Sequence, residues 1–129
     1  MRRVSVTLPD DIYRQLEELE AKTKITNRSR LIGDAITLFY NQNIEDEAVY
    51  AGSLVTLYDH SRGETVYSVV DVQHDFHEVI RVTTHVHLTE EKCVEVTTVL
   101  GKGKDIKELV SRLRRISGVL TVQYNVIKL

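Results

Sequence analysis

The sequence of 129 residues contains only one cysteine and one proline, and it lacks any long apolar run. A single cysteine excludes a disulfide within the chain and is normal for a reducing compartment. No stretch approaches the roughly 20 apolar residues of a membrane span, and the N-terminus lacks the apolar core of a secretion signal. We therefore expect a cytoplasmic protein that does not enter a membrane.

The chain also lacks a large excess of positive or negative charge. The 17 lysine and arginine residues nearly balance the 19 aspartate and glutamate residues, so the formal net charge is −2. This balance excludes a protein that coats nucleic acid through bulk positive charge, but it allows one that grips DNA with a small local patch. The length suits one ordinary domain or two very small ones.

Histidine is absent from the first 59 residues. All five histidines and the only cysteine then fall within 34 consecutive positions. This uneven distribution makes the second part of the chain the place to look for a metal site. The residues concerned are His60, His74, His77, His85, His87 and Cys93.

The first 43 residues predict one strand and two helices. Apolar and polar side chains alternate in residues 4–8, which indicates a strand with one apolar face. Pro9 suits the first position of a helix, and the apolar spacing that follows predicts a helix to about Ala21. Asn27 is a good N-cap for a second helix.

A unit of this size cannot close a core alone, and a single strand with one apolar face is an open edge that needs a partner. The economical solution is a dimer in which two copies pair their strands and pack four helices beneath them. This is the ribbon-helix-helix arrangement. It presents Arg3, Ser5 and Thr7 of both chains on one outer face.

A linker is expected at residues 44–50, within a stretch that breaks the periodicity and carries three consecutive acids. Residues 51–129 predict the order β-α-β-β-α-β, an α+β, ferredoxin-like domain with two helices on one face of an antiparallel sheet. The expected elements are a strand at 54–58, a helix at 64–77, strands at 80–88 and 93–100, a helix at 106–116 stopped at Gly118, and a strand at 120–126.

Pairing of the strands at 80–88 and 93–100 as a hairpin places His87 opposite Cys93 and His85 opposite Glu95. Directly opposed Cβ atoms lie about 4.5–5.5 Å apart, so two imidazoles and a thiol converge on one polar face. Glu95 can accept a hydrogen bond from the free N–H of a metal-bound His85. These ligand types suit nickel, copper or zinc.

A fourth ligand has to come from outside this hairpin. His74 is the best candidate and His77 the second, both near the end of the predicted helix at 64–77. We expect that helix to cover the apolar face of the sheet, away from His85 and His87. His74 would then reach the site of another subunit.

Two histidine motifs and one cysteine motif follow an N-terminal segment that contains R-V-S-V-T-L and N-R-S. They are Q-H at Gln73–His74, H-V-H at His85–His87 and C-x-E at Cys93–Glu95. Together they resemble the NikR family of nickel-responsive transcriptional regulators over essentially the whole chain. The resemblance implies one square-planar Ni²⁺ per subunit, bound by His85, His87 and Cys93 of one chain and His74 of another, with Glu95, Gln73 and Tyr58 around these ligands.

The resemblance also implies a homotetramer, a dimer of dimers with a core of four ACT-like regulatory domains and two flanking DNA-binding dimers. Nickel binding would promote binding to a palindromic operator in double-stranded DNA and repress genes for nickel uptake. A two-stranded ribbon fits the major groove, and a helix N-terminus can hold a phosphate. The expected DNA contacts are Arg3, Ser5 and Thr7 at the bases and Asn27, Arg28 and Ser29 at a phosphate.

The chain departs from the family at Arg30 and Gly33, where an acidic residue and an arginine are common. Loss of the acid argues against the secondary cation site that family members form with Asp34. His60 and His77 are left over as expected surface residues.

Two other functions compete with a nickel regulator. A metal-dependent hydrolase would need an open water position and a base such as Glu95, but a fourth protein ligand argues against it. The stronger alternative is a ribbon-helix-helix repressor whose ACT-like domain senses copper, cobalt, zinc or a small molecule. We therefore expect a regulator and not an enzyme.

Overall fold

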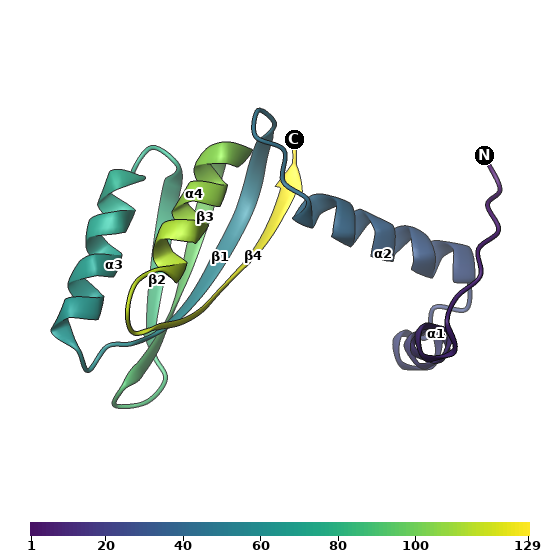
Figure 1. Ribbon diagram of the computed structural model, residues 1–129, viewed down its shortest axis with the longest axis horizontal. Helices are drawn as coiled ribbons and strands as arrows, with labels where there is room; N and C mark the ends of the chain where they lie inside the picture. The colour runs from purple at the N-terminus through teal and green to yellow at the C-terminus, as the bar shows by residue number, and fades with distance from the viewer. The chain divides into compact units, whose positions relative to one another are not determined.

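Four helices and four strands make up the computed structural model, which describes residues 1–129 and divides into compact units at residues 1–39 and 40–129 (Figure 1). The predicted mixture of helices and antiparallel sheet is confirmed. None of the helices has the length and apolar composition that crossing a membrane requires. The elements are α1 (Asp10–Thr23), α2 (Arg28–Gln42), β1 (Val49–Asp59), α3 (Gly63–Asp75), β2 (Ile80–His87), β3 (Lys92–Lys102), α4 (Gly103–Arg114) and β4 (Val119–Lys128).

Both helices of the first unit begin close to where the sequence places them. Pro9 is the N-cap of α1 rather than its first helical residue, with φ −55° and ψ 151°. The prediction for Asn27 is confirmed, because its Oδ1 accepts the backbone N–H of Arg30 at 3.2 Å in the first turn of α2. This bond satisfies one of the amides that every helix start leaves free.

The strand expected at residues 4–8 is not formed, and this prediction is wrong for the isolated chain. Residues 1–9 have no regular secondary structure, and the side chains of Val4 and Val6 are 84% and 68% exposed. A strand exists only where another strand supplies hydrogen-bond partners. The first unit of one chain holds no second strand, so the alternating pattern has nothing to pair with.

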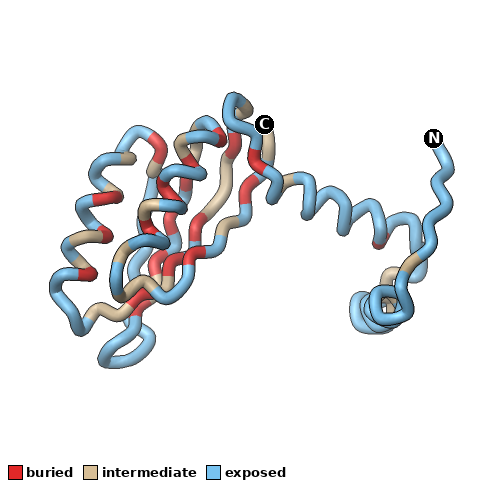
Figure 2. The backbone as a smooth tube through the Cα atoms, in the orientation of Figure 1, coloured by how far each residue is buried: buried red, intermediate tan, exposed pale blue.

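The second unit is a four-stranded antiparallel sheet with the strand order β2-β3-β1-β4. Helices α3 and α4 pack on one face of this sheet, and the buried residues gather between the two layers (Figures 1 and 2). Strands β2 and β4 are the edges. Because β2 is an edge strand, its histidines His85 and His87 stay exposed although they lie on the side of the sheet that the helices cover.

The predicted orientation of the sheet was wrong. We expected the helices on the apolar face away from His85 and His87. The side chains of that face are exposed, namely Val82, Val86 and Val96, while Cys93 and Glu95 face the helices. Both faces of β3 have apolar positions, so β3 alone does not decide which face is covered. The neighbouring strand does: the large buried side chains of β1 fall on the Cys93 face in the observed register, namely Tyr50, Leu54 and Tyr58.

Gly118 lies in the turn before β4, beyond the end of α4 at Arg114 rather than at the end of the helix. Its φ of +96° is one that L-residues rarely adopt. A Cβ at this position would also overlap the side chain of Thr65, whose Oγ1 donates to the carbonyl of Ser117 at 2.8 Å. The turn therefore requires glycine for two independent reasons.

Gly118→Ala is expected to lower the free energy of unfolding by about 1–3 kcal/mol, because alanine must occupy a strained conformation and displace Thr65. Gly63→Ala is the matched control, since nothing lies within 4 Å of a Cβ at the start of α3. Urea denaturation of both variants checks this. Equal stabilities of the two variants would contradict it.

Candidate metal centre

The hairpin of β2 and β3 has the register that the alternating pattern predicts. His85 lies opposite Glu95, and His87 lies opposite Cys93. The imidazole rings of His85 and His87 have centroids 4.8 Å apart. Two nitrogen donors and one sulfur donor therefore come from neighbouring positions of one hairpin, as the sequence predicts.

Glu95 is the polar centre of this region, with only 5% of its surface exposed. Its Oε1 accepts the hydroxyl of Tyr58 at 3.0 Å and lies 3.1 Å from Nδ1 of His85. Its Oε2 accepts the side-chain amide of Gln73 at 2.5 Å. Three partners from β1, β2 and α3 thus replace the water that the carboxylate loses on burial.

This arrangement decides which nitrogen of His85 is available. Nδ1 is engaged by Glu95, so Nε2 is the ring nitrogen that remains free to bind a metal ion. A carboxylate that holds the other ring nitrogen orients a ligating imidazole and makes it a stronger ligand. The contacts of His85 fit the environment of a metal ligand.

Cys93 is fully buried and lies opposite Tyr58 on β1. Burial raises the pKa of the Cys93 thiol above its ordinary value, and the neighbouring Tyr58 hydroxyl only partly opposes this effect. Burial likewise raises the pKa of Tyr58, with further contributions from Cys93 and Glu95. The thiol is therefore protonated at neutral pH, and a metal that binds it has to displace that proton.

His60 lies next to the predicted ligands, although the sequence placed it on the surface. Its ring centroid is 4.5 Å from that of His87, and its Nε2 is 3.2 Å from the carbonyl of Thr89. The backbone N–H of His60 also donates to the carbonyl of Glu91 at 2.7 Å. The end of β1 is thus tied to the hairpin turn, a neighbourhood that sequence spacing does not reveal.

His74 lies in the last turn of α3 and His77 in the turn that follows it. Both are exposed, and their ring centroids are 6.1 Å apart. Nowhere in the single chain are three histidine, cysteine, aspartate or glutamate side chains arranged to hold one ion. The structure therefore brings His85 and His87 together beside Cys93, but it does not add His74 to them. Imidazole and thiolate donors remain a set that suits nickel, copper or zinc.

The predicted DNA contacts belong to the first unit. Arg3, Ser5 and Thr7 are exposed in the segment without secondary structure. Arg28 donates from Nη2 and Nε to Glu20 at 2.6 and 2.9 Å, so its guanidinium is already paired with a carboxylate. Ser29 is exposed in the first turn of α2, whereas Asn27 uses its side chain as the cap.

Comparison with known proteins matches both parts of the chain. Residues 51–127 match the family described as NikR C terminal nickel binding domain, and residues 2–43 match the ribbon-helix-helix protein, copG family. A Syntrophus aciditrophicus protein named as a nickel-responsive regulator is 35% identical over 119 aligned positions, 91% of this chain and 86% of that protein. A Methanopyrus kandleri protein with the same name is 35% identical over 130 positions, 97% and 90% of the two chains.

A solved structure shows the fold of the second unit. The ACT domain from GTP pyrophosphokinase of Chlorobium tepidum superposes with a TM-score of 0.52 at 16% identity, covering 59% of this chain and 97% of that chain. The ACT-like architecture expected for the regulatory part therefore has a structural counterpart.

Glu95→Gln is expected to destabilise the protein by about 1–3 kcal/mol in the presence of a chelator, because the buried side chain loses one of its three hydrogen-bond partners. The same change should weaken nickel binding by roughly 10–100-fold, since His85 loses the carboxylate that orients it. Urea denaturation and nickel titration measure the two effects.

Glu91→Gln is the control, because Glu91 is exposed in the turn of the same hairpin. A Glu95→Gln protein as stable as this control would show that the carboxylate does not organise the site.

Proposed function

Because the chain belongs to the family of ribbon-helix-helix regulators with a NikR C-terminal nickel-binding domain, we propose that it is a transcriptional regulator whose DNA binding responds to nickel. The observation that carries the proposal is the β2–β3 hairpin, where His85 and His87 lie beside the buried Cys93 and Glu95 holds Nδ1 of His85. Membership of a family of regulators argues against the alternative function of a metal-dependent hydrolase.

We propose one Ni²⁺ per subunit in a square-planar site formed by His85, His87 and Cys93 of one chain and His74 of another. The exposed side of α3 supports the contribution of His74 to a second chain. Tyr67 is 74% exposed on that helix and Val70 is also exposed, at the spacing that places both beside His74. Apolar side chains next to an exposed ligand are typical of an interface.

A homotetramer built as a dimer of dimers would cover the apolar surfaces that one chain leaves open. The second unit, residues 40–129, is the regulatory unit of this proposal. Its sheet face opposite the helices exposes Val55, Val82, Val86 and Val96. In the first unit an apolar hollow of about 240 Å³ lies between residues 6–8, α1 and α2. Each unit thus has a surface of its own for a second copy.

In the DNA-binding dimer, residues 4–8 of two copies would pair as the ribbon and present Arg3, Ser5 and Thr7 to the bases of a major groove. Two-fold symmetry of the protein would require a palindromic operator. Ser29 and the first turn of α2 would hold a phosphate, with Asn27 as the cap that keeps these amides in place. Arg28 would exchange Glu20 for the phosphate.

Nickel, when bound, would supply a positive centre that joins donors from two chains. The residues of this protein then set the arrangement: Glu95 orients His85, and Tyr58 and Gln73 hold Glu95. We propose that this arrangement places two DNA-binding dimers for one operator, and that the outcome in the cytoplasm is repression of nickel-uptake genes. The proposed domains are 1–43 for DNA binding, a connecting segment at 44–50, and 51–129 for nickel binding and tetramer formation.

The secondary cation site of the family is not part of this proposal. Arg30 stands where an acid is common, and its Nε lies 3.9 Å from a carboxylate oxygen of Asp34 on the exposed face of α2. A guanidinium beside that carboxylate competes with a bound cation.

Selection of bound duplexes from a random DNA pool, with and without NiCl₂, tests the proposed function. We expect enrichment of a palindromic sequence only with nickel, and loss of this enrichment in His85→Ala because one metal ligand is missing. His77→Ala is the control and should behave as the unchanged protein. Nickel-independent enrichment, or tight nickel binding by His85→Ala, would contradict the proposal.

Co-expression of two differently tagged variants tests whether His74 acts across chains. His74→Ala and His85→Ala should each bind nickel weakly when alone. In a mixed oligomer the first supplies His85, His87 and Cys93 and the second supplies His74, so tight nickel binding should return. If the ligands came from one chain, the mixture would bind no better than either variant.

A further inference from the structure

Residues 44–48, between α2 and β1, were expected to be part of a linker, but hydrogen bonds and ion pairs hold them against the second unit. We propose that this docked segment is a fixed part of the regulatory unit, held by an ion-pair clamp, and that it passes nickel-dependent rearrangements directly into α2. The proposal rests on the proposed function for its second half only. The docking itself depends on contacts within residues 40–129.

Backbone hydrogen bonds attach the docked segment to the start of α4 and to β1. The N–H of Gly103 donates to the carbonyl of Ala48 at 2.8 Å, and the N–H of Lys104 donates to the carbonyl of Asp46 at 3.0 Å. The N–H of Glu45 donates to the hydroxyl of Tyr50 at 2.9 Å. A flexible linker would give these groups to water instead.

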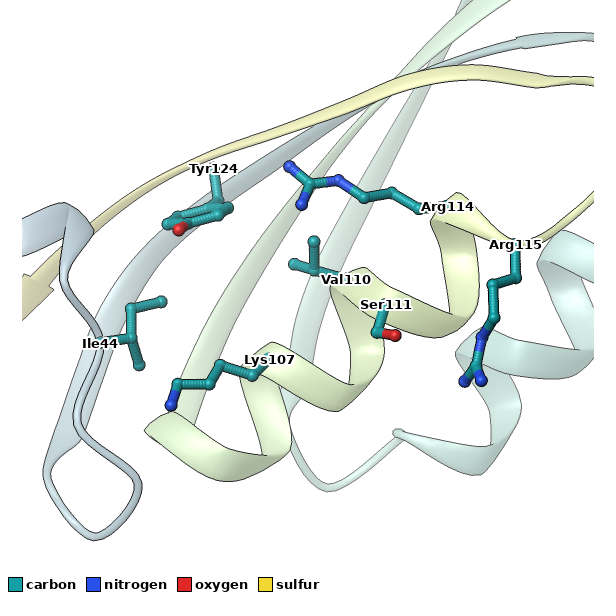
Figure 3. Close-up of a pocket in the computed structure, with 7 residues that line it drawn as sticks. All are labelled: Ile44, Lys107, Val110, Ser111, Arg114, Arg115 and Tyr124. Carbon is teal, nitrogen blue, oxygen red and sulfur yellow. The ribbon is translucent and has the colours of Figure 1, made fainter.

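Side-chain burial and a close backbone approach also hold the docked segment. Ile44 is buried in the core, and it lines a pocket of about 280 Å³ together with Val110 of α4 and Tyr124 of β4 (Figure 3). A Cβ at Gly103 would overlap the carbonyl oxygen of Glu45. The first residue of α4 therefore has to be glycine for the segment to lie where it does.

Three consecutive acids of the docked segment pair with lysines of the regulatory unit. The carboxylate of Asp46 lies 2.7 Å from Nζ of Lys107, and that of Glu45 lies 3.1 Å from Nζ of Lys128. Glu47 lies 3.3 Å from Nζ of Lys102 and 3.5 Å from that of Lys104. Exposed pairs are individually weak and are screened by salt, so this clamp can open without unfolding the unit.

The last turn of α2 is attached to the same unit. The hydroxyl of Tyr124 donates to the carbonyl of Gln42 at 3.1 Å, and Nζ of Lys128 donates to the hydroxyl of Tyr40 at 3.2 Å. The boundary between the compact units falls between Phe39 and Tyr40, inside a continuous helix. The second unit therefore holds both the last turn of α2 and the segment that follows it.

Amide hydrogen exchange of the full-length protein tests the docking. The amides of Glu45, Gly103 and Lys104 should be protected, and protection should fall as NaCl is raised. Asp46→Asn combined with Glu47→Gln should lower protection about tenfold and weaken its salt dependence, because two of the three acids lose their charge and only the pair of Glu45 with Lys128 remains. Glu108→Gln is the matched control, since it breaks only the exposed pair with Arg115 on the same helix.

Rapid exchange of these amides in the unchanged protein would overturn the docking. Protection that is identical in the double variant would show that charge does not hold the segment. Gly103→Ala provides a second route, because it displaces the segment by overlap rather than by loss of charge.

Nickel titration and DNA binding with and without NiCl₂ test the coupling in both variants. Nickel affinity should be kept, whereas the gain in DNA affinity on adding nickel should fall by at least about tenfold. An unchanged gain would overturn the coupling. If nickel does not raise the DNA affinity of the unchanged protein, the proposed function is refuted. The hydrogen-exchange result would then bear on the docking of residues 44–48 only.

Discussion

The buried carboxylate of Glu95 is the constraint on which the regulatory unit depends. It can leave water only where hydrogen-bond donors replace the solvent, and those donors come from β1, β2 and α3. The contact with Gln73 holds α3 over the sheet, and the contact with His85 fixes the orientation of a proposed ligand. Domain packing and ligand orientation are therefore consequences of the same set of bonds.

A single chain provides some of the features that the proposed function requires and lacks others. The hairpin aligns two imidazoles and a buried thiol, while His74 lies on the exposed side of α3 with Tyr67 beside it. The regulatory unit also leaves the apolar sheet face uncovered, and residues 4–8 have no strand to pair with. Association of chains would meet all three needs at once, and the docked segment would bring its effect to α2.

Several predictions that depend on residues close in sequence were accurate. The alternation in residues 80–88 and 93–100 gave the correct pairing of His85 with Glu95, and Asn27 was correctly identified as a helix cap because a cap acts within one turn. A prediction that depends on distant residues was wrong. The covered face of β3 was chosen from its own alternation, yet the register of Tyr58 on β1 decides it.

The sequence by itself determined the Asn27 cap, the hairpin register and the donor types of the candidate centre, since each depends on spacing along one or two adjacent elements. Only the tertiary structure decided which sheet face the helices cover, that His60 lies against His87, and that Lys107 pairs with Asp46 of the segment between α2 and β1. The physical reason is that these features are sums of contacts between segments far apart in the chain. Local patterning carries no information about which of those segments become neighbours.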